Sequence, residues 1–291
     1  MLMISIYTGK QLREKTETGG IINTTANAEK GTYVQVNDLK MYYETHGAGI
    51  PVLLIHGGME TCQMWHPFLQ FFSDDYMLIT PDSRAHGRTN NPSQEFRYDL
   101  MAADMAGLIE ALGLQKPFVA GYSDGGQTAL HMAMVYPGLA RGYLIGGIYY
   151  CMTPEWQETM QGLLGFDGPG KVDFERVLHK NPELVQTLQA RHDLFHAAGY
   201  WKSFLSQISS QWMVPLNYSA ADFAKIVDPL FFFCGDRDVF CPPEQNLEMY
   251  RMLKQAEMAV IPNADHFSIA QQFDVVATMM QGFIERITVT P

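Results

Sequence analysis

One short motif in this sequence has the residue types of an activated nucleophile. The run Gly121-Tyr122-Ser123-Asp124-Gly125-Gly126 places a serine between glycines. It follows apolar residues 117–120 and precedes a segment with helical spacing, which is the context that a G-x-S-x-G turn requires. Small residues at 121 and 125 let strand and helix approach, and the Ser123 hydroxyl would stand at the helix N-terminus, where free N–H groups favour negative charge. The motif predicts a serine nucleophile for acyl transfer.

A serine hydroxyl is a weak nucleophile unless a base takes its proton and an acid orients that base. With the serine on such a turn, the acid and then the histidine follow along the chain, each on a loop after a strand. Asp238 follows the apolar run 229–234, and His266 follows the run 258–261. We assign His266 as the general base and Asp238 as its carboxylate. Asp236 is the alternative acid, but a residue next to the turn glycine more often braces the loop.

The other histidines are poorer candidates for the base. His131 lies in the helical segment after the serine, whereas His179, His192 and His196 lie in the middle of the chain, where no strand is predicted. None of these four follows a strand at the end of the sheet. We expect them to be surface or packing residues.

An oxyanion hole needs two backbone donors aimed at the tetrahedral intermediate. The residue after the nucleophile supplies one, which is the N–H of Asp124. The second is expected from His56-Gly57-Gly58-Met59, which directly follows another apolar run, and Gly58 is the predicted donor. Glycines there permit close backbone approach; a plain turn at the end of a strand is the alternative.

Apolar runs alternate with helical segments along most of the chain. A hairpin is predicted from residues 32–36 and 39–43, with Asn37 and Asp38 at the turn. Runs typical of strands buried on both faces occur at residues 51–56, 76–80, 117–121, 142–148, 229–234 and 258–261. Helical spacing occurs at residues 98–112, 124–136, 243–254 and 267–286. The alternation predicts an α/β protein, with a mostly parallel sheet covered by helices on both faces.

The alternation is interrupted once, between Ile148 and Asp228. This stretch has no buried-strand run but has helical segments at residues 183–195 and 200–214. Helices inserted here are most simply a lid over the carboxyl end of the sheet, where ligands bind in such folds. A helical decoration without substrate contact is the alternative. The aromatic residues of the stretch suggest an apolar pocket or only a helical core: Trp156, Phe166, Phe195, Trp201, Phe204 and Trp212.

Composition restricts the class of protein further. The 291 residues include 20 Lys+Arg and 31 Asp+Glu, a net charge of −11, and without a basic run this argues against nucleic-acid binding. A chain this long buries about 75% of its unfolded surface and needs no disulfide or metal to hold its core. Four cysteines without metal-ligand spacing, no secretory signal and no apolar span predict a soluble, cytoplasmic protein. Residues 1–30 read as a weakly structured extension.

From about residue 32 onward the chain resembles the α/β-hydrolase family. Five motifs carry the resemblance in order: His56-Gly57-Gly58, residues 81–88, residues 121–125, residues 235–238, and Asp265-His266. Two positions depart from the usual pattern, because Ala85 and Asp265 stand where glycine is common. Neither departure removes a reacting group.

The resemblance implies an eight-stranded sheet with a helical cap inserted after the sixth strand. We therefore expect an N-terminal extension at residues 1–30, a core at 31–150 and 227–291, and a cap at 151–226. The resemblance also implies that His86 braces its loop and is not a catalyst. Asp265 would either raise the basicity of the adjacent His266 or compete with Asp238 for it.

A serine nucleophile excludes the dehalogenase and epoxide-hydrolase branches of the resemblance, which use an aspartate. The expected activity is hydrolysis of a small carboxylic ester through an acyl-enzyme, with no cofactor and no metal. C–C bond hydrolysis by the same triad is an alternative. A ligand-binding member with little turnover is less favoured, because a binding protein has no need of all three triad residues.

Asp124 lies beside the nucleophile, and the Ser-Asp-Gly-Gly elbow looks like that of hydrolases acting on amino-acid esters. There this aspartate meets a substrate ammonium; capping the helix is the alternative role. The predicted substrate contacts are Asp124, Tyr122, Trp156 and Trp201. The predicted partner is a small molecule, and the sequence indicates no oligomeric state.

Overall fold

A computed structural model describes residues 31–72 and 75–289 of the chain. Eight strands form one sheet in the order β1-β2-β4-β3-β5-β6-β9-β10. Their bounds are β1 Thr32–Val36, β2 Leu39–Gly47, β3 Ile50–Ile55, β4 Tyr76–Pro81, β5 Phe118–Tyr122, β6 Gly142–Gly146, β9 Leu230–Gly235 and β10 Ala256–Ile261. The expected extension at residues 1–30 lies outside the described residues.

The sheet is mostly parallel, as predicted. Only β1 with β2 and β2 with β4 pair antiparallel, while every pair from β4 through β10 is parallel. The predicted hairpin is confirmed as β1 and β2. The central strands β5, β6 and β9 are buried along their whole length, which explains why their sequences are continuously apolar and do not alternate.

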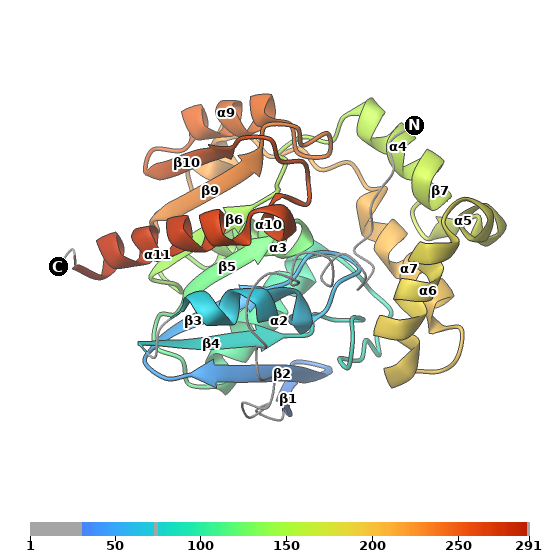
Figure 1. Cartoon of the computed structure of the whole chain (residues 1–291), viewed down its shortest axis with the longest axis horizontal. Helices are drawn as coiled ribbons and strands as arrows, with labels where there is room; N and C mark the ends of the chain where they lie inside the picture. The colour runs from blue at the N-terminus through green and yellow to red at the C-terminus, as the bar shows by residue number, and fades with distance from the viewer. Residues whose placement is uncertain (1–30, 73–74, 290–291) are drawn as a thin grey trace, which may run out of the picture.

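Helices cover both faces of this sheet (Figure 1). One apolar cluster joins the sheet to α2 (Tyr98–Ala111), α3 (Asp124–Val135) and α9 (Pro243–Met252). A second cluster joins it to η1 (Cys62–Phe71), α10 (Ser268–Gln271) and α11 (Phe273–Val289). The sequence predicted one helix over 267–286, where the structure has the two helices α10 and α11. It did not predict η1, a 3₁₀ helix that contains Pro67.

The cap region lies between β6 and β9. It contains α4 (Pro154–Leu164), α5 (Phe174–Lys180), α6 (Pro182–Arg191), η2 (Asp193–Phe195), α7 (Tyr200–Trp212) and α8 (Ala220–Phe223). A small antiparallel pair, β7 (Phe166–Gly168) and β8 (Lys171–Val172), corrects the prediction of helices alone. Gly168 at the end of β7 and Gly170 in the turn both have positive φ. We propose residues 151–226 as the bounds of the cap.

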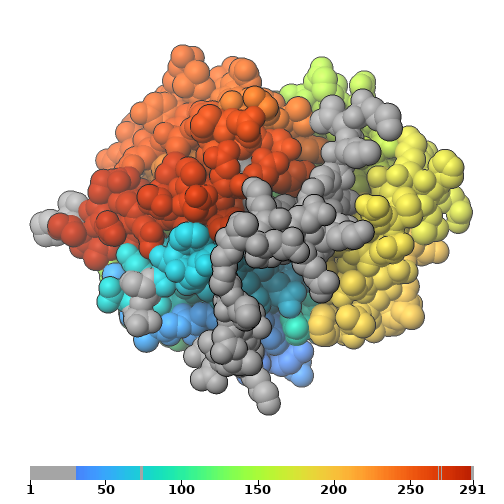
Figure 2. Space-filling model, viewed as in Figure 1, coloured from blue at the N-terminus to red at the C-terminus, as the bar shows by residue number. Residues whose placement is uncertain are grey.

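The cap packs against one end of the sheet. In Figure 1 helices α4 to α7 lie together on one side of the molecule, and in Figure 2 the light-green and yellow cap lies beside the orange-red and cyan core. A third apolar cluster fills the space between cap and core, and includes Met59 and Tyr149 from the core with Leu188 and Phe204 from the cap. Within the described ranges, no helix is both long and apolar enough to span a membrane.

Candidate active site

Five parallel strands deliver the candidate site residues to one edge of the sheet. Strands β3, β5, β6, β9 and β10 end at residues 55, 122, 146, 235 and 261. Because parallel strands share a direction, the loops that follow them meet beside the cap. These loops carry Gly58, Ser123, Gly147, Asp238 and His266, all but Asp238 of which line one cavity.

Ser123 occupies the strained turn that the motif predicts. Its backbone lies at φ 55°, ψ −119°, a conformation that non-glycine residues rarely adopt. A side chain at Gly121 would put its Cβ 2.1 Å from the carbonyl oxygen of Gly125, and one at Gly125 would put it 2.2 Å from that of Ile55. The flanking glycines are therefore required by the contact between strand and helix, and strain of about 1–3 kcal/mol is held by that packing.

Ser123, His266 and Asp238 form a chain of hydrogen bonds. His266 Nε2 lies 3.0 Å from Ser123 Oγ, and His266 Nδ1 lies 2.9 Å from Asp238 Oδ2. The other carboxylate oxygen of Asp238 accepts the backbone N–H groups of Phe240 and Cys241 at 2.9 and 2.7 Å. Asp238 is therefore fixed in place, and an imidazole whose Nδ1–H points to it presents Nε2 as a proton acceptor to the serine.

The two alternative carboxylates have structural roles. Asp236 Oδ1 accepts the N–H of Ala264 at 3.1 Å, so it braces the acid loop against the histidine loop. Asp265 Oδ1 accepts the N–H of Phe267 at 2.9 Å and the side-chain amide of Gln271 at 3.0 Å. Asp265 therefore caps the turn that follows the histidine and does not compete with Asp238 for Nδ1.

The environment of His266 favours its protonated form. Burial by itself would lower the pKa of this imidazole, but the charge and hydrogen bond of Asp238 outweigh burial, and the carboxylates of Asp124 and Asp265 add to them. The pKa of His266 is therefore raised above its ordinary value. A more basic imidazole accepts the serine proton more readily, but it is neutral only at a higher pH.

Gly58 is placed to donate into an oxyanion hole. The N–H of Gly57 donates to the Met64 sulfur at 3.3 Å, and the N–H of Met59 donates to His86 Nε2 at 3.2 Å. The amides on both sides of Gly58 are thus engaged elsewhere. Gly58 lines the cavity together with Ser123 and Asp124, so its N–H and that of Asp124 are the candidate donors.

The side chain of Asp124 is buried in the wall of the cavity. Its Oδ1 accepts the hydroxyl of Tyr98 at 2.7 Å and Nε1 of Trp212 at 2.8 Å, and its Oδ2 lies 2.9 Å from the same Nε1. Burial raises the pKa of Asp124 to about 6, opposed by these two hydrogen bonds and by His266. Both direct partners are neutral, so the ionised carboxylate keeps its charge beside the nucleophile.

The cavity has a volume of about 180 Å³ and two walls of different character. The core contributes the polar side chains Ser123, Asp124 and His266, together with apolar ones such as Met59 and Phe240. The cap contributes mainly apolar side chains from three helices: Trp156, Met160, Leu163, Leu164, Leu184 and Trp212. Trp156 therefore lies where a substrate contact was predicted.

Two other predicted contacts lie outside the cavity. Tyr122 is 3% exposed, its hydroxyl donates to the backbone carbonyl of His266, and its ring stacks on Phe233. Trp201 is also 3% exposed and packs edge-on against Phe174 at 5.6 Å. Neither ring lines the cavity, so the structure gives no support to the prediction that Tyr122 and Trp201 touch substrate. The alternation of side chains along β5 points the Tyr122 ring into the core. The Trp201 ring lies on the buried face of α7.

Histidines that the sequence set aside form part of the loop packing. His86 is fully buried, and its Nδ1 lies 2.9 Å from the carbonyl of Arg84. His192 Nδ1 accepts the N–H of Gly87 at 2.9 Å. Burial lowers the pKa of His86 well below its ordinary value and that of His192 to about 3. Both are neutral packing residues, as expected.

Sequence reasoning missed several polar residues at the cavity, among them Tyr98, Glu60 and Arg191. Tyr98 holds Asp124, while Glu60 and Arg191 line the cavity as an ion pair with Nη1 and Oε1 2.8 Å apart. Arg191 also donates to the carbonyl of Met59 at 3.1 Å, which ties α6 of the cap to the Gly58 loop. No sequence signal joins positions 60 and 191, because their proximity depends on how the cap docks.

Ligand atoms of Asp238, Cys241 and His266 lie close enough together to consider a metal at the triad. The thiol of Cys241 donates to the carbonyl of Gly147 at 3.0 Å, and burial, with the charge of Asp238, raises its pKa well above the ordinary value. His266 Nδ1 already faces Asp238. These groups are therefore arranged for proton transfer and fit a metal ion poorly.

The fold and the Ser–His–Asp arrangement are those of a hydrolase with a nucleophile elbow. The family model of the "Alpha/beta hydrolase family" matches residues 52–279. The chain belongs to this family.

Several known proteins are similar to this chain over most of its length at low identity. The 2-hydroxy-6-oxo-2,4-heptadienoate hydrolase of Pseudomonas putida is 23% identical over 86% of this chain and 94% of its own. A thermophilic esterase from Thermogutta terrifontis has a TM-score of 0.70 and 21% identity, covering 89% of this chain and 99% of that one. A meta-cleavage product hydrolase from Pseudomonas fluorescens IP01 gives the same four values. These structural likenesses establish the fold.

Proposed function

We propose that this protein is a serine hydrolase that cleaves small carboxylic esters through an acyl-enzyme. The observation that carries the proposal is the hydrogen-bonded series Ser123–His266–Asp238, which opens into a largely apolar cavity. The similarity to a known esterase agrees with it.

The geometry supports a two-stage acyl transfer. Ser123 Oγ attacks the carbonyl carbon while His266 Nε2 takes its proton, and Asp238 stabilises the resulting imidazolium. The N–H groups of Gly58 and Asp124 hold the oxyanion, each donor contributing about 3 kcal/mol to transition-state stabilisation. His266 then protonates the leaving alcohol, and a water activated by the same histidine hydrolyses the acyl-enzyme.

The charges that line the cavity favour neutral or cationic substrates. Glu60 and Arg191 neutralise each other across 2.8 Å, whereas Asp124 has only neutral hydrogen-bond donors as direct partners. Near neutral pH the wall beside the nucleophile therefore has excess negative charge. An anionic acyl group would be repelled there, and an ammonium would be attracted.

An amino-acid ester is the second candidate substrate, on this observation about Asp124. C–C bond hydrolysis is a further candidate reaction, because two of the similar proteins are named for dienoate and meta-cleavage product substrates. A dienoate carries a carboxylate, which the charge of Asp124 disfavours. We therefore rank C–C hydrolysis behind ester hydrolysis for this chain.

The first experiment is labelling with a fluorophosphonate probe. Wild type is expected to be labelled and Ser123→Ala is not, because the probe reacts only with an activated serine. Unlabelled wild type would remove the proposal.

A substrate panel then separates the candidates. The p-nitrophenyl esters of propionate, alanine and succinate present a neutral, a cationic and an anionic acyl group of similar size. We expect turnover of the propionate and alanine esters and weak turnover of the succinate monoester. Faster cleavage of 2-hydroxy-6-oxo-2,4-heptadienoate than of every ester would favour the C–C alternative.

A further inference from the structure

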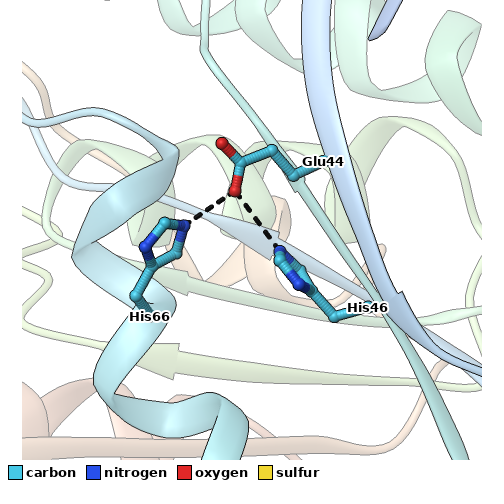
Figure 3. A group of neighbouring side chains, drawn as sticks. All are labelled: Glu44, His46 and His66. Carbon is cyan, nitrogen blue, oxygen red and sulfur yellow. Dashed lines mark hydrogen bonds and ion pairs between the residues drawn. The ribbon is translucent and has the colours of Figure 1, made fainter. Parts of the chain in front are cut away.

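A second group of metal-ligand side chains lies away from the cavity. Glu44 and His46 lie on β2, and His66 lies on η1, the 3₁₀ helix that packs over that side of the sheet. Figure 3 shows the three side chains pointing toward one another from these two elements, with the carboxylate between the two imidazoles. None of the three lines the cavity beside Ser123.

The spacing of the three ligand atoms is that of a coordination shell. His66 Nε2 lies 2.7 Å and His46 Nε2 lies 3.3 Å from the same oxygen, Glu44 Oε2, and the three atoms all lie within 4.8 Å of one another. Ligands about 2.0–2.1 Å from a tetrahedral zinc ion are about 3.3 Å apart. Small side-chain adjustments would place one ion in contact with all three atoms.

The carboxylate is held in place from behind. Glu44 is 7% exposed, and its other oxygen, Oε1, accepts the hydroxyl of Tyr42 at 3.1 Å and the thiol of Cys62 at 3.6 Å. Hydrogen bonds of this kind orient a metal-binding carboxylate and are typical supports of a metal site. Oε2 is thereby directed at the two histidines.

The imidazoles leave an opening to solvent. The side chain of His66 is 41% exposed and that of His46 is 21% exposed. An ion could enter between them and keep a water as its fourth ligand. Two imidazole nitrogens and one carboxylate oxygen suit Zn²⁺, Co²⁺ or Ni²⁺ better than Ca²⁺ or Mg²⁺, which prefer all-oxygen shells.

We propose that Glu44, His46 and His66 bind one divalent transition-metal ion of the zinc class. The bound ion links β2 to η1, two elements that are already joined by the contacts of Cys62 and His66 with Glu44. Helix η1 follows the loop that carries Gly58, so the ion stabilises the segment that leads away from the oxyanion loop. Its role is structural, because the site is separate from the reacting groups.

Metal uptake tests the site directly. The full-length protein, stripped with EDTA and dialysed, is titrated with Co²⁺ and Zn²⁺ in the His266→Ala background, which removes the other possible ligand group around the triad. One equivalent of Co²⁺ with visible d–d absorption is expected. His66→Ala and His46→Ala in this background should each weaken binding by about a hundredfold or more, since each removes one of three ligands.

Stability provides a second readout. Zn²⁺ at about a hundred times its Kd should raise the melting temperature by about 5 °C, and this rise should be lost in His66→Ala. His66→Ala is the primary variant, because His66 has the most exposed side chain of the three and its removal should disturb folding least. Circular dichroism of the metal-free variant tests whether it is folded. His179→Ala, which removes an exposed cap histidine, is the matched control and should keep full binding.

The proposal is overturned by either of two results. One is no uptake of Co²⁺ or Zn²⁺ by the His266→Ala protein at millimolar concentration, which would make the group a hydrogen-bonded network only. The other is unchanged affinity in both His46→Ala and His66→Ala. Neither result bears on the proposed hydrolase activity, which is measured separately.

Discussion

The core wall and the cap wall of the cavity differ in chemical character and in the elements that carry them. The core wall carries the polar reacting groups among apolar residues such as Met59 and Phe240. These groups sit on loops that follow parallel strands: Ser123 is locked by close contacts of Gly121 and Gly125, and Asp238 by two backbone N–H groups. The cap wall is mainly apolar and stands on surface helices such as α4 and α6. We therefore propose that the core wall cleaves the bond and that the cap wall sets the size and shape of the substrate.

Removal of the nucleophile should change activity more than any other substitution in either wall. Ser123→Ala should lower kcat for p-nitrophenyl propionate by about a million-fold while leaving ligand affinity nearly unchanged, because only the core wall loses a reacting group. Steady-state kinetics and binding of a non-hydrolysable propionate analogue measure the two effects. Residual activity within tenfold of wild type would mean that another group does the chemistry.

Gly58 lies where the two walls meet, and its substitution should disturb both. A Cβ at this position would lie 2.5 Å from Asp124 Oδ2 and 2.5 Å from Trp212 Cζ2. Gly58→Ala should therefore displace the oxyanion donor and lower kcat by about a hundredfold. Gly162→Ala on α4 is the control, since a Cβ there meets nothing within 4 Å, and its kcat should match wild type. Equal kinetics for both variants would argue against Gly58 as a donor.

Asp124 belongs to the core wall but is expected to act on specificity. Asp124→Asn keeps the shape that Tyr98 and Trp212 contact and removes the charge. The kcat/KM ratio of alanine ester to propionate ester should fall by about tenfold, equivalent to about 1.4 kcal/mol. Asp99→Asn, an exposed carboxylate on α2, should leave the ratio unchanged. An unchanged ratio in Asp124→Asn as well would leave the carboxylate a structural role only.

The same substitution should shift the pH profile. The active base is neutral His266, so kcat/KM rises with pH through the pKa of this imidazole. That pKa is raised in the protein, with Asp124 among the causes, so the wild-type midpoint should lie above 6.5. Asp124→Asn removes a negative charge that favours the imidazolium, so the midpoint should move to lower pH. A move to higher pH would contradict this arrangement of charges.

Changes in the cap wall should give the smallest effects. Trp156→Ala removes an aromatic side chain that lines the cavity, and KM for propionate esters should rise several-fold with little change in kcat. Longer acyl chains should gain relative to propionate, as the pocket is wider. Trp201→Phe is the matched control: its ring is buried against Phe174 outside the cavity, so acyl-chain preference should be unchanged. A large loss of kcat in Trp156→Ala would break the division between walls.

Local sequence signals predicted most of the fold because they arise from single elements. Continuous apolar runs marked six of the eight strands, and the turn Asn37-Asp38 marked the hairpin of the other two. These sequence signals failed for elements whose local geometry produces no clear pattern. Helix η1 has 3₁₀ geometry around Pro67, and the β7–β8 pair has only three and two residues, too short for a period to be visible.

The three candidate catalytic residues were identified by type and by position after a strand, which the sequence by itself determines. The order of strand, serine and glycine at 121–125 sets the elbow, and the loops at Asp238 and His266 follow runs that predict strands. The first of these, β9, is buried along its length, whereas β10 is a partly exposed strand at the edge of the sheet. In a parallel sheet the carboxyl ends of the strands lie at one edge, so the loops that follow them are expected to lie close together.

Only the tertiary structure decided which side chains from distant elements meet. The pairing of Arg191 with Glu60, the contact of Trp212 with Asp124, and the convergence of His66 on Glu44 join residues at least 22 positions apart in the sequence. Tyr122 and Trp201 were assigned to substrate by residue type, and the packing turned both inward. Such contacts depend on the docking of whole elements, a sum of many weak interactions that no local pattern encodes.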